Sequence, residues 1–195
     1  MPPRGSLSER RQVIQEAQIE LRRQPLYLDT ETTGLEGTDE IVEICLLDHD
    51  GTVLVESFVK PKRRIPPDVV RIHGITNEMV KGAPAWPEVW EQVAARLGGK
   101  HVIIYNADFD VRLMQQSHAK YGMPWNLPAD PFCCAMKLYA RFYGEWNYRY
   151  GNYRWHSLEA AAQQCGIPLP PQVHRAREDA ELARQVVQYM AKQKG

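Results

Sequence analysis

The chain has 195 residues, of which 44% are hydrophobic and 25% charged. That length supports one well-packed domain and is short for two. Lys and Arg together number 24, as do Asp and Glu. The near-zero net charge argues against a protein that coats nucleic acid through its overall field, although a local binding site is still allowed.

The N-terminal region is expected to be separate from the main domain. Residues 1–5 should be disordered and residues 8–23 should form a helix that ends before Pro25. We therefore assign residues 1–24 to a tail with an accessory helix and residues 25–195 to the main domain.

Apolar runs and turn residues predict the remaining elements. Strands are expected in HVIIYN and at about 26–30, 40–48 and 52–59, with a tight turn at Asp50-Gly51 between the last two. Apolar residues at helical spacing predict helices in PDVVRIH, in WPEVWEQVAARL, and at about 109–120, 132–143, 157–165 and 178–192. This order indicates an α/β fold with a mixed sheet flanked by helices.

No apolar run is long enough to span a membrane, and the N-terminus lacks the apolar core of a secretory signal. We expect a cytoplasmic protein with no membrane partner. The cysteines have no C-x-x-C spacing, which favours reduced, mostly buried thiols over a zinc site; they are Cys45, Cys133, Cys134 and Cys165.

Four acidic residues lie at the ends of predicted elements. Asp29 and Glu31 close the first strand, Asp110 follows the strand in YNADFD, and Asp179 opens the last helix. Side chains alternate along a strand, so Asp29 and Glu31 point to one face and Thr30 points away. Strand ends and helix starts meet at one edge of an α/β sheet, where these acids can converge.

Paired acids on one face are unfavourable unless a cation lies between them. Mg²⁺ takes carboxylate oxygens and leaves positions for water and phosphate, and two ions about 3.5–4 Å apart can clamp both oxygens of a phosphodiester displacement. The D-x-E pattern alone does not decide this, because it recurs at Asp179 and Glu181, where a helix would splay the acids. His174, five residues before Asp179, can take a proton from water near neutral pH.

Five segments in order resemble the DEDDh group of 3′→5′ exonucleases, the DnaQ-like family that includes the bacterial polymerase proofreading subunit. They are YLDTETTGL, IHGIT, YNADFD, HSLEAAAQQCGI and HRAREDA, and the resemblance covers roughly residues 26–192. It implies an RNase H-like fold, here with an extra N-terminal helix. It also implies metal-dependent removal of nucleoside 5′-monophosphates from a 3′ end.

The resemblance implies roles for each acid. Asp29, Glu31 and Asp179 would hold the ion that carries the attacking water, with Asp29 bridging to a second ion, Asp110 completing the set and His174 as general base. Two Mg²⁺ ions are expected, with Mn²⁺ able to substitute. The neighbouring Asp108 is expected to face solvent.

The resemblance also implies substrate contacts. Thr32, Gly34 and Leu35 would approach the terminal nucleotide, with glycine allowing close approach because it has no Cβ. His73 would either contact the terminal base or sugar or close a turn, and Asn106 would either contact substrate or cap a helix. Both pairs of alternatives stay open.

The sequence departs from the family pattern in two places. The N-terminal helix is either a packing accessory or an oligomer contact. The segment GEWNYRYGNYRW, residues 144–155, is rich in aromatics and arginine and either holds a single strand or covers the core. Covering the core is the preferred interpretation, most of all for Trp155.

The favoured function is hydrolysis at the 3′ end of single-stranded DNA, in repair or proofreading. An exoribonuclease or oligoribonuclease with the same site is the alternative, since motifs do not reveal how the 2′-hydroxyl is recognised. An inactive subunit that binds a polymerase is a third hypothesis. A homodimer or a polymerase partner remains open.

Overall fold

The computed structural model describes residues 7–127, 131–171 and 174–194, so the disorder expected for residues 1–5 lies outside the described residues. The main sheet has five strands, which are β1 (Leu26–Thr32), β2 (Ile41–Leu47), β3 (Val53–Phe58), β4 (Val102–Ile104) and β5 (Phe132–Cys134). Their order is β3-β2-β1-β4-β5. Because β2 runs antiparallel to both neighbours while β1, β4 and β5 are parallel, the predicted mixed sheet is confirmed.

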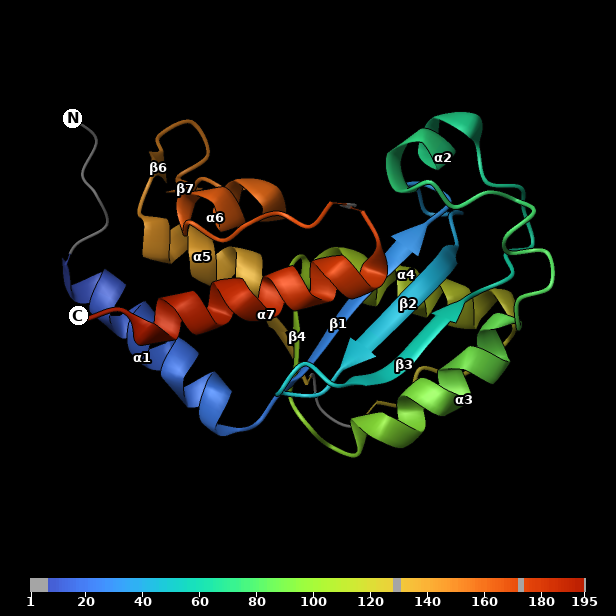
Figure 1. Cartoon of the computed structure of the whole chain (residues 1–195), viewed down its shortest axis with the longest axis horizontal. Helices are drawn as coiled ribbons and strands as arrows, with labels where there is room; N and C mark the ends of the chain where they lie inside the picture. The colour runs from blue at the N-terminus through green and yellow to red at the C-terminus, as the bar shows by residue number, and fades with distance from the viewer. Residues whose placement is uncertain (1–6, 128–130, 172–173, 195) are drawn as a thin grey trace.

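Helices cover both faces of this sheet (Figure 1). They are α1 (Leu7–Arg22), α2 (Pro67–His73), α3 (Trp86–Leu97), α4 (Ala107–Lys120), α5 (Ala135–Tyr143), α6 (Leu158–Gln164) and α7 (Ala176–Lys192). A small hairpin of β6 (Trp146–Asn147) and β7 (Asn152–Tyr153) connects α5 to α6. No helix in the described part of the chain is long and apolar enough to cross a membrane.

The expected helix over 132–143 is wrong in its first three residues. Phe132–Cys134 instead pairs in parallel with β4 and completes the edge of the sheet. Phe132 packs with the α3 and α4 side of the core and Cys133 with the α7 side, so these residues alternate as a strand does.

The alternation along β1 positions the acids. Leu26 and Leu28 pack with α3 and α4, whereas Tyr27 packs with α1, α5 and α7. Continuing this alternation places Asp29 and Glu31 on the α7 face and Thr30 on the opposite face.

The accessory helix α1 packs against α5 and α7. Glu16 accepts hydrogen bonds from Arg141 of α5 at 2.7 and 3.1 Å, and Gln18 donates to the carbonyl oxygen of Ala191 at 3.0 Å. These contacts support a packing role for the helix.

The expectation that the segment 144–155 covers the core is wrong for three of its aromatics. Tyr148, Tyr150 and Trp155 are 70%, 67% and 56% exposed. The β6–β7 hairpin turns only Trp146 and Tyr153 toward each other, with ring centroids 5.0 Å apart, and leaves the other rings outside. All four cysteines are free, and only Cys45 is fully buried.

Candidate active site

Three carboxylates converge where the end of β1 meets the first turn of α7. Asp29, Glu31 and Asp179 each offer an oxygen, and these oxygens all lie within 4.8 Å of one another. The strand supplies two acids on one face and the helix, packed across that face, supplies the third (Figure 1). The structure therefore brings together three of the four acids that the sequence singled out.

The electrostatics of this cluster are unfavourable without a cation. Burial raises the pKa of Asp29 well above its usual range, and the charges of Asp110 and Asp179 raise it further. Burial, followed by the charges of Asp179 and Glu43, raises the pKa of Glu31 to about 8. Burial raises the pKa of Asp179 to about 6, while the charge and backbone hydrogen bond of His174 oppose the rise.

Asp110 lies beside this cluster but is not one of its three converging carboxylates. It is buried in the first turn of α4 and accepts a hydrogen bond from the Thr30 hydroxyl at 2.7 Å. Burial raises the pKa of Asp110 to about 7, with the Thr30 hydrogen bond acting against the rise. Thr30 was not predicted as a site residue, although a polar side chain on a buried strand face signals such a partner.

His174 lies two residues before α7, in a left-handed backbone conformation with φ of 61°. Its Nε2 is 3.5 Å from Glu159 Oε1 of α6, and its side chain is 40% exposed. The imidazole is therefore held by a neighbouring carboxylate and open to solvent. Glu159 was not predicted as a site residue.

A partly buried ion pair fixes the start of α7. Glu43 of β2 accepts bonds from Arg175 at 2.5 to 3.1 Å and from the backbone N–H of Ala176 at 3.0 Å. Glu43 faces Glu31 across the β1–β2 ladder. Since Arg175 directly follows His174, the pair ties the sheet to the loop and helix that carry His174 and Asp179. A charged residue within the apolar run IVEICLL was the available sequence signal.

Three further predicted site residues lie at the end of β1 and in the loop that follows it. The Thr32 hydroxyl donates to the Gly34 carbonyl at 2.8 Å, and Leu35 is 73% exposed. A Cβ on Gly34 would lie 2.6 Å from an oxygen of Asp39, whose carboxylate accepts from Thr33 and from the Glu36 N–H at 2.7 Å each. Glycine is thus needed for the loop to close on Asp39.

His73 has both ring nitrogens occupied. Its Nδ1 accepts from the Ile75 N–H at 3.0 Å, which leaves Nε2–H to donate to the Thr32 carbonyl at 3.2 Å. Burial lowers the pKa of His73, favouring this neutral form. The contacts therefore match the turn-closing alternative. Asn106 is exposed at the start of α4 and makes no side-chain capping bond.

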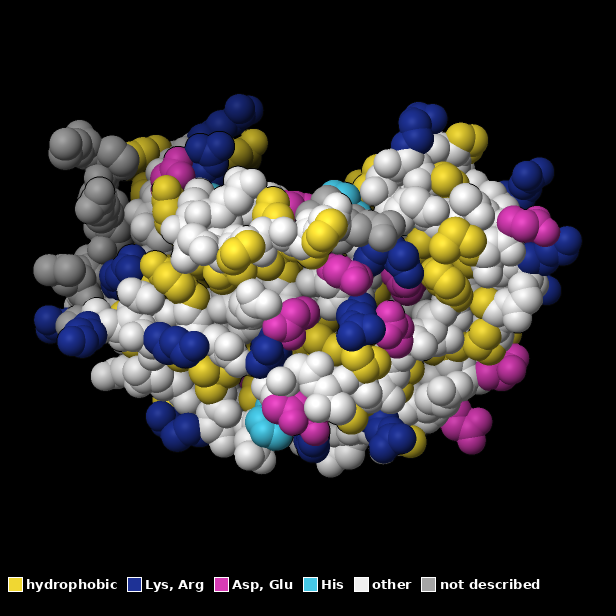
Figure 2. Space-filling view, viewed as in Figure 1, with side chains coloured by type: hydrophobic (Ala, Val, Ile, Leu, Met, Phe, Trp, Pro, Cys, Tyr) yellow, Lys and Arg dark blue, Asp and Glu magenta, His cyan; other side chains and the backbone are white. Residues whose placement is uncertain are grey.

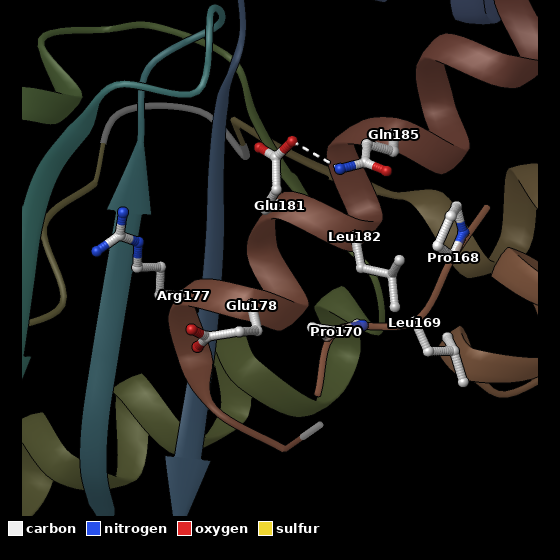
Figure 3. A pocket seen from close by; sticks show the side chains of 8 residues that line it. All are labelled: Pro168, Leu169, Pro170, Arg177, Glu178, Glu181, Leu182 and Gln185. Carbon is white, nitrogen blue, oxygen red and sulfur yellow. Dashed lines mark hydrogen bonds between the residues drawn. The ribbon is translucent and has the colours of Figure 1, made fainter. Parts of the chain in front are cut away.

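Two acids near the cluster do not join it. Asp108 is exposed and pairs with Lys137 at 2.6 Å, so the expectation that it faces solvent is confirmed. Glu181, two residues after Asp179, instead pairs with Arg184 at 2.7 Å. Glu181 also lines a separate cavity of about 400 Å³ between α7 and residues 168–170 (Figure 3).

The donor set fits a divalent cation. Three carboxylates with raised pKa values lie together, and the nearby guanidinium of Arg175 is already engaged by Glu43. Oxygen donors of this kind suit hard cations.

The molecular surface is hollowed between a projection over the β6–β7 hairpin and another over α2, with a histidine side chain between them (Figure 2).

Comparison with known proteins agrees with this geometry. The Exonuclease family model matches residues 26–187. An uncharacterised exonuclease of Escherichia phage 186, named CP81, is 39% identical over 188 residues, covering 92% of this chain and 94% of the phage protein. The DNA polymerase III subunit epsilon of Pasteurella multocida is 28% identical over 176 residues, which cover 83% of this chain and 65% of that subunit.

Among solved structures, exonuclease X in complex with 5′-overhanging duplex DNA is similar, with a TM-score of 0.62 and 29% identity over 85% of this chain and 90% of that one. The RNase H-like exonuclease fold and the DnaQ-like resemblance are thereby confirmed. Exonucleases of this family generally need divalent metal ions, which agrees with the acidic cluster. The chain therefore belongs to the Exonuclease family and is a 3′→5′ exonuclease of the DEDDh type.

Proposed function

We propose that this exonuclease hydrolyses phosphodiester bonds at the 3′ end of single-stranded DNA and releases nucleoside 5′-monophosphates. The observation that carries the proposal is the convergence of Asp29, Glu31 and Asp179 beside a histidine held by Glu159. A DNA substrate is supported by the similarity to a DNA-bound exonuclease and to a DNA polymerase subunit. Repair or proofreading in the cytoplasm is the setting we propose.

Asp29, Glu31 and Asp179 would hold one Mg²⁺ ion, and Asp29 with Asp110 would hold a second, with Mn²⁺ able to replace both. When bound, such ions activate the attacking water and offset the charge that develops on the phosphate. The clustered oxygens and their raised pKa values support this assignment.

His174 would act as general base. It takes a proton from the water whose oxygen attacks the phosphorus, while the bond from phosphorus to the 3′-oxygen of the preceding nucleotide breaks. Glu159, 3.5 Å from Nε2, stabilises the resulting imidazolium. The exposure of His174 gives water access to the ring.

The loop after β1 would hold the terminal nucleotide. The exposed Leu35 offers an apolar face to the base, and Thr32 and Gly34 set the backbone beside it. We propose that His73 supports this loop through the Thr32 carbonyl and that the exposed Asn106 contacts the substrate.

The test uses 5′-labelled single strands of DNA and RNA with the same sequence, in Mg²⁺ or in EDTA, resolved on a gel. We expect a metal-dependent ladder that shortens from the 3′ end, more rapidly with DNA. Faster cleavage of RNA would assign an exoribonuclease instead. Binding of the strands without cleavage in either Mg²⁺ or Mn²⁺ would contradict the enzyme and favour a binding subunit.

A further inference from the structure

The aromatic side chains of the β6–β7 hairpin divide into an anchored set and an exposed set. Trp146 and Tyr153 pair across the two strands, with ring planes at 86°. The Tyr153 hydroxyl donates a hydrogen bond to Glu9 of α1. Glu9 in turn lies 3.6 Å from Arg141 of α5. The hairpin is therefore fixed to the body of the molecule through Tyr153.

Outside this pair, the hairpin and the residues after it have an exposed face that leaves large aromatic rings in water. Tyr148, Tyr150 and Trp155 are each more than half exposed. Tyr150 and Trp155 also line a cavity of about 510 Å³, a size within the range of ligand pockets. Burial of an aromatic ring is strongly favourable, so several exposed rings beside one cavity indicate a surface that takes a partner.

The charge on this face is suited to phosphate. The Arg149 guanidinium lies 5.4 Å from the centre of the Tyr150 ring, and no carboxylate pairs with it among the described residues. Arg154 lines the same cavity and pairs with Glu145 at 2.9 Å. Lys and Arg side chains also stand on the projection over the hairpin in Figure 2.

The exposed face is continuous with the active site along the chain. Trp155 is four residues before Glu159, whose carboxylate contacts His174 at 3.5 Å. Four residues span at most about 14 Å, which is about four nucleotides at a stacked spacing of 3.4 Å. A strand of several nucleotides whose 3′ end lies at the acids is therefore long enough to extend past Glu159 to these rings, and a longer strand can place more bases on them than a very short one.

We propose that Tyr148, Arg149, Tyr150 and Trp155 bind the single-stranded segment that precedes the 3′ terminus. The rings stack on unpaired bases and Arg149 pairs with phosphate. This inference rests on the proposed function and adds to it a binding surface for the upstream strand. The combination of exposed rings with arginine favours nucleic acid over a second copy of the chain.

The test compares the whole chain with the double variant Tyr150→Ala/Trp155→Ala. Its substrates are single-stranded oligothymidylates of about 20 and about three nucleotides. For the long strand we expect KM to rise on the order of tenfold, while kcat/KM for the short one stays unchanged. Tyr150→Phe/Trp155→Phe, which keeps ring faces, should restore KM. Ile19→Ala, at another exposed apolar position, is the matched control.

An equal loss for both lengths, or no loss for either, would overturn the proposal. So would a dimer that the double variant dissociates without changing KM, because the face would then join two copies. Fluorescence anisotropy of the long oligothymidylate in EDTA measures binding without hydrolysis, so it tests the binding surface separately from the proposed nuclease function. If neither strand were hydrolysed but the double variant still bound the long strand more weakly, the proposed function would be refuted and the binding surface would stand.

Discussion

The acidic cluster and the β6–β7 hairpin both hold side chains in unfavourable surroundings, but for opposite reasons. In the cluster, burial and neighbouring negative charges raise the pKa values of Asp29 and Glu31. On the hairpin, Tyr148 and Tyr150 leave 70% and 67% of their surface in water. A cation relieves the first arrangement, and a stacked base relieves the second.

The two regions also differ in how they are held. The cluster lies between the central strand and α7, joined by the ion pair of Glu43 with Arg175. The hairpin is tied to α1 through Tyr153 and Glu9. Changes in the cluster should therefore affect every substrate, whereas changes at the hairpin should affect only strands long enough to reach it.

The largest effect is expected from Asp29→Asn. Loss of a central carboxylate removes several kcal/mol of charge stabilisation from metal-assisted catalysis, so kcat should fall more than about 10³-fold. Single-turnover hydrolysis of long and short strands measures it. Asp108→Asn, a change at the exposed acid of the same segment, should retain activity. Similar losses in both variants would contradict the assignment.

A smaller loss is expected from His174→Ala. Removing a general base lowers kcat by about 10²-fold to 10⁴-fold. The decline in rate toward acidic pH should also disappear, because no imidazole remains to be protonated. The measurement is kcat across pH for both chains. An unchanged acidic limb in an active variant would contradict this role.

Glu43→Gln should weaken the attachment of the start of α7 to β2. The substitution removes a charged acceptor from Arg175 and lowers the free energy of unfolding by about 1–3 kcal/mol. Urea denaturation measures the difference. Glu56→Gln, which breaks the exposed pair with Arg177 at 3.4 Å, should have almost no effect. Equal effects would show that the Glu43 pair has no special structural role.

The metal-free chain should become less stable as pH rises from about 4 to about 8. The folded pKa values of Asp179 and Glu31 are raised to about 6 and about 8, so the folded state holds protons that the unfolded chain has lost. Thermal unfolding in EDTA should show Tm falling by several degrees across this window and rising again with Mg²⁺. A Glu31→Gln chain should show a flatter decline, and an equally steep one would contradict the account.

The smallest effect is expected from loosening the hairpin. Glu9→Gln weakens the bond from Tyr153 and should raise KM for long strands about threefold, with no change for short ones. Gln12→Ala on the same helix is the control. Steady-state kinetics at both lengths make the comparison, and a loss at short length would place Glu9 in the fold of the active site.

The sequence predicted the cluster because local rules determine it. Alternation along β1 put Asp29 and Glu31 on one face, and Asp50-Gly51 set the β2–β3 hairpin, whose turn closes with Gly51 N–H donating to Asp48 at 3.0 Å. Convergence with Asp179 followed from the expectation that strand ends and helix starts meet at one edge of an α/β sheet, and the family resemblance supplied the roles of the acids. The assigned roles of these residues remain predictions.

Sequence-based prediction was wrong where contacts between distant segments of the chain determine the structure. Phe132–Cys134 is a strand because β4 lies beside it, and three residues alone do not show a period. Trp155 was expected in the core, yet it follows β7 and is 56% exposed, whereas Trp146 and Tyr153 pack against each other. The role of Glu43 depends on Arg175, which is distant in sequence.

The most direct test of the metal centre is Mn²⁺ binding by isothermal titration calorimetry to the wild-type chain and its Asp29→Asn and Asp108→Asn variants. The account predicts that two ions bind to the wild type and to Asp108→Asn, and that Asp29→Asn loses this binding. Equal binding by all three chains would contradict the claim that the converging carboxylates form a metal centre.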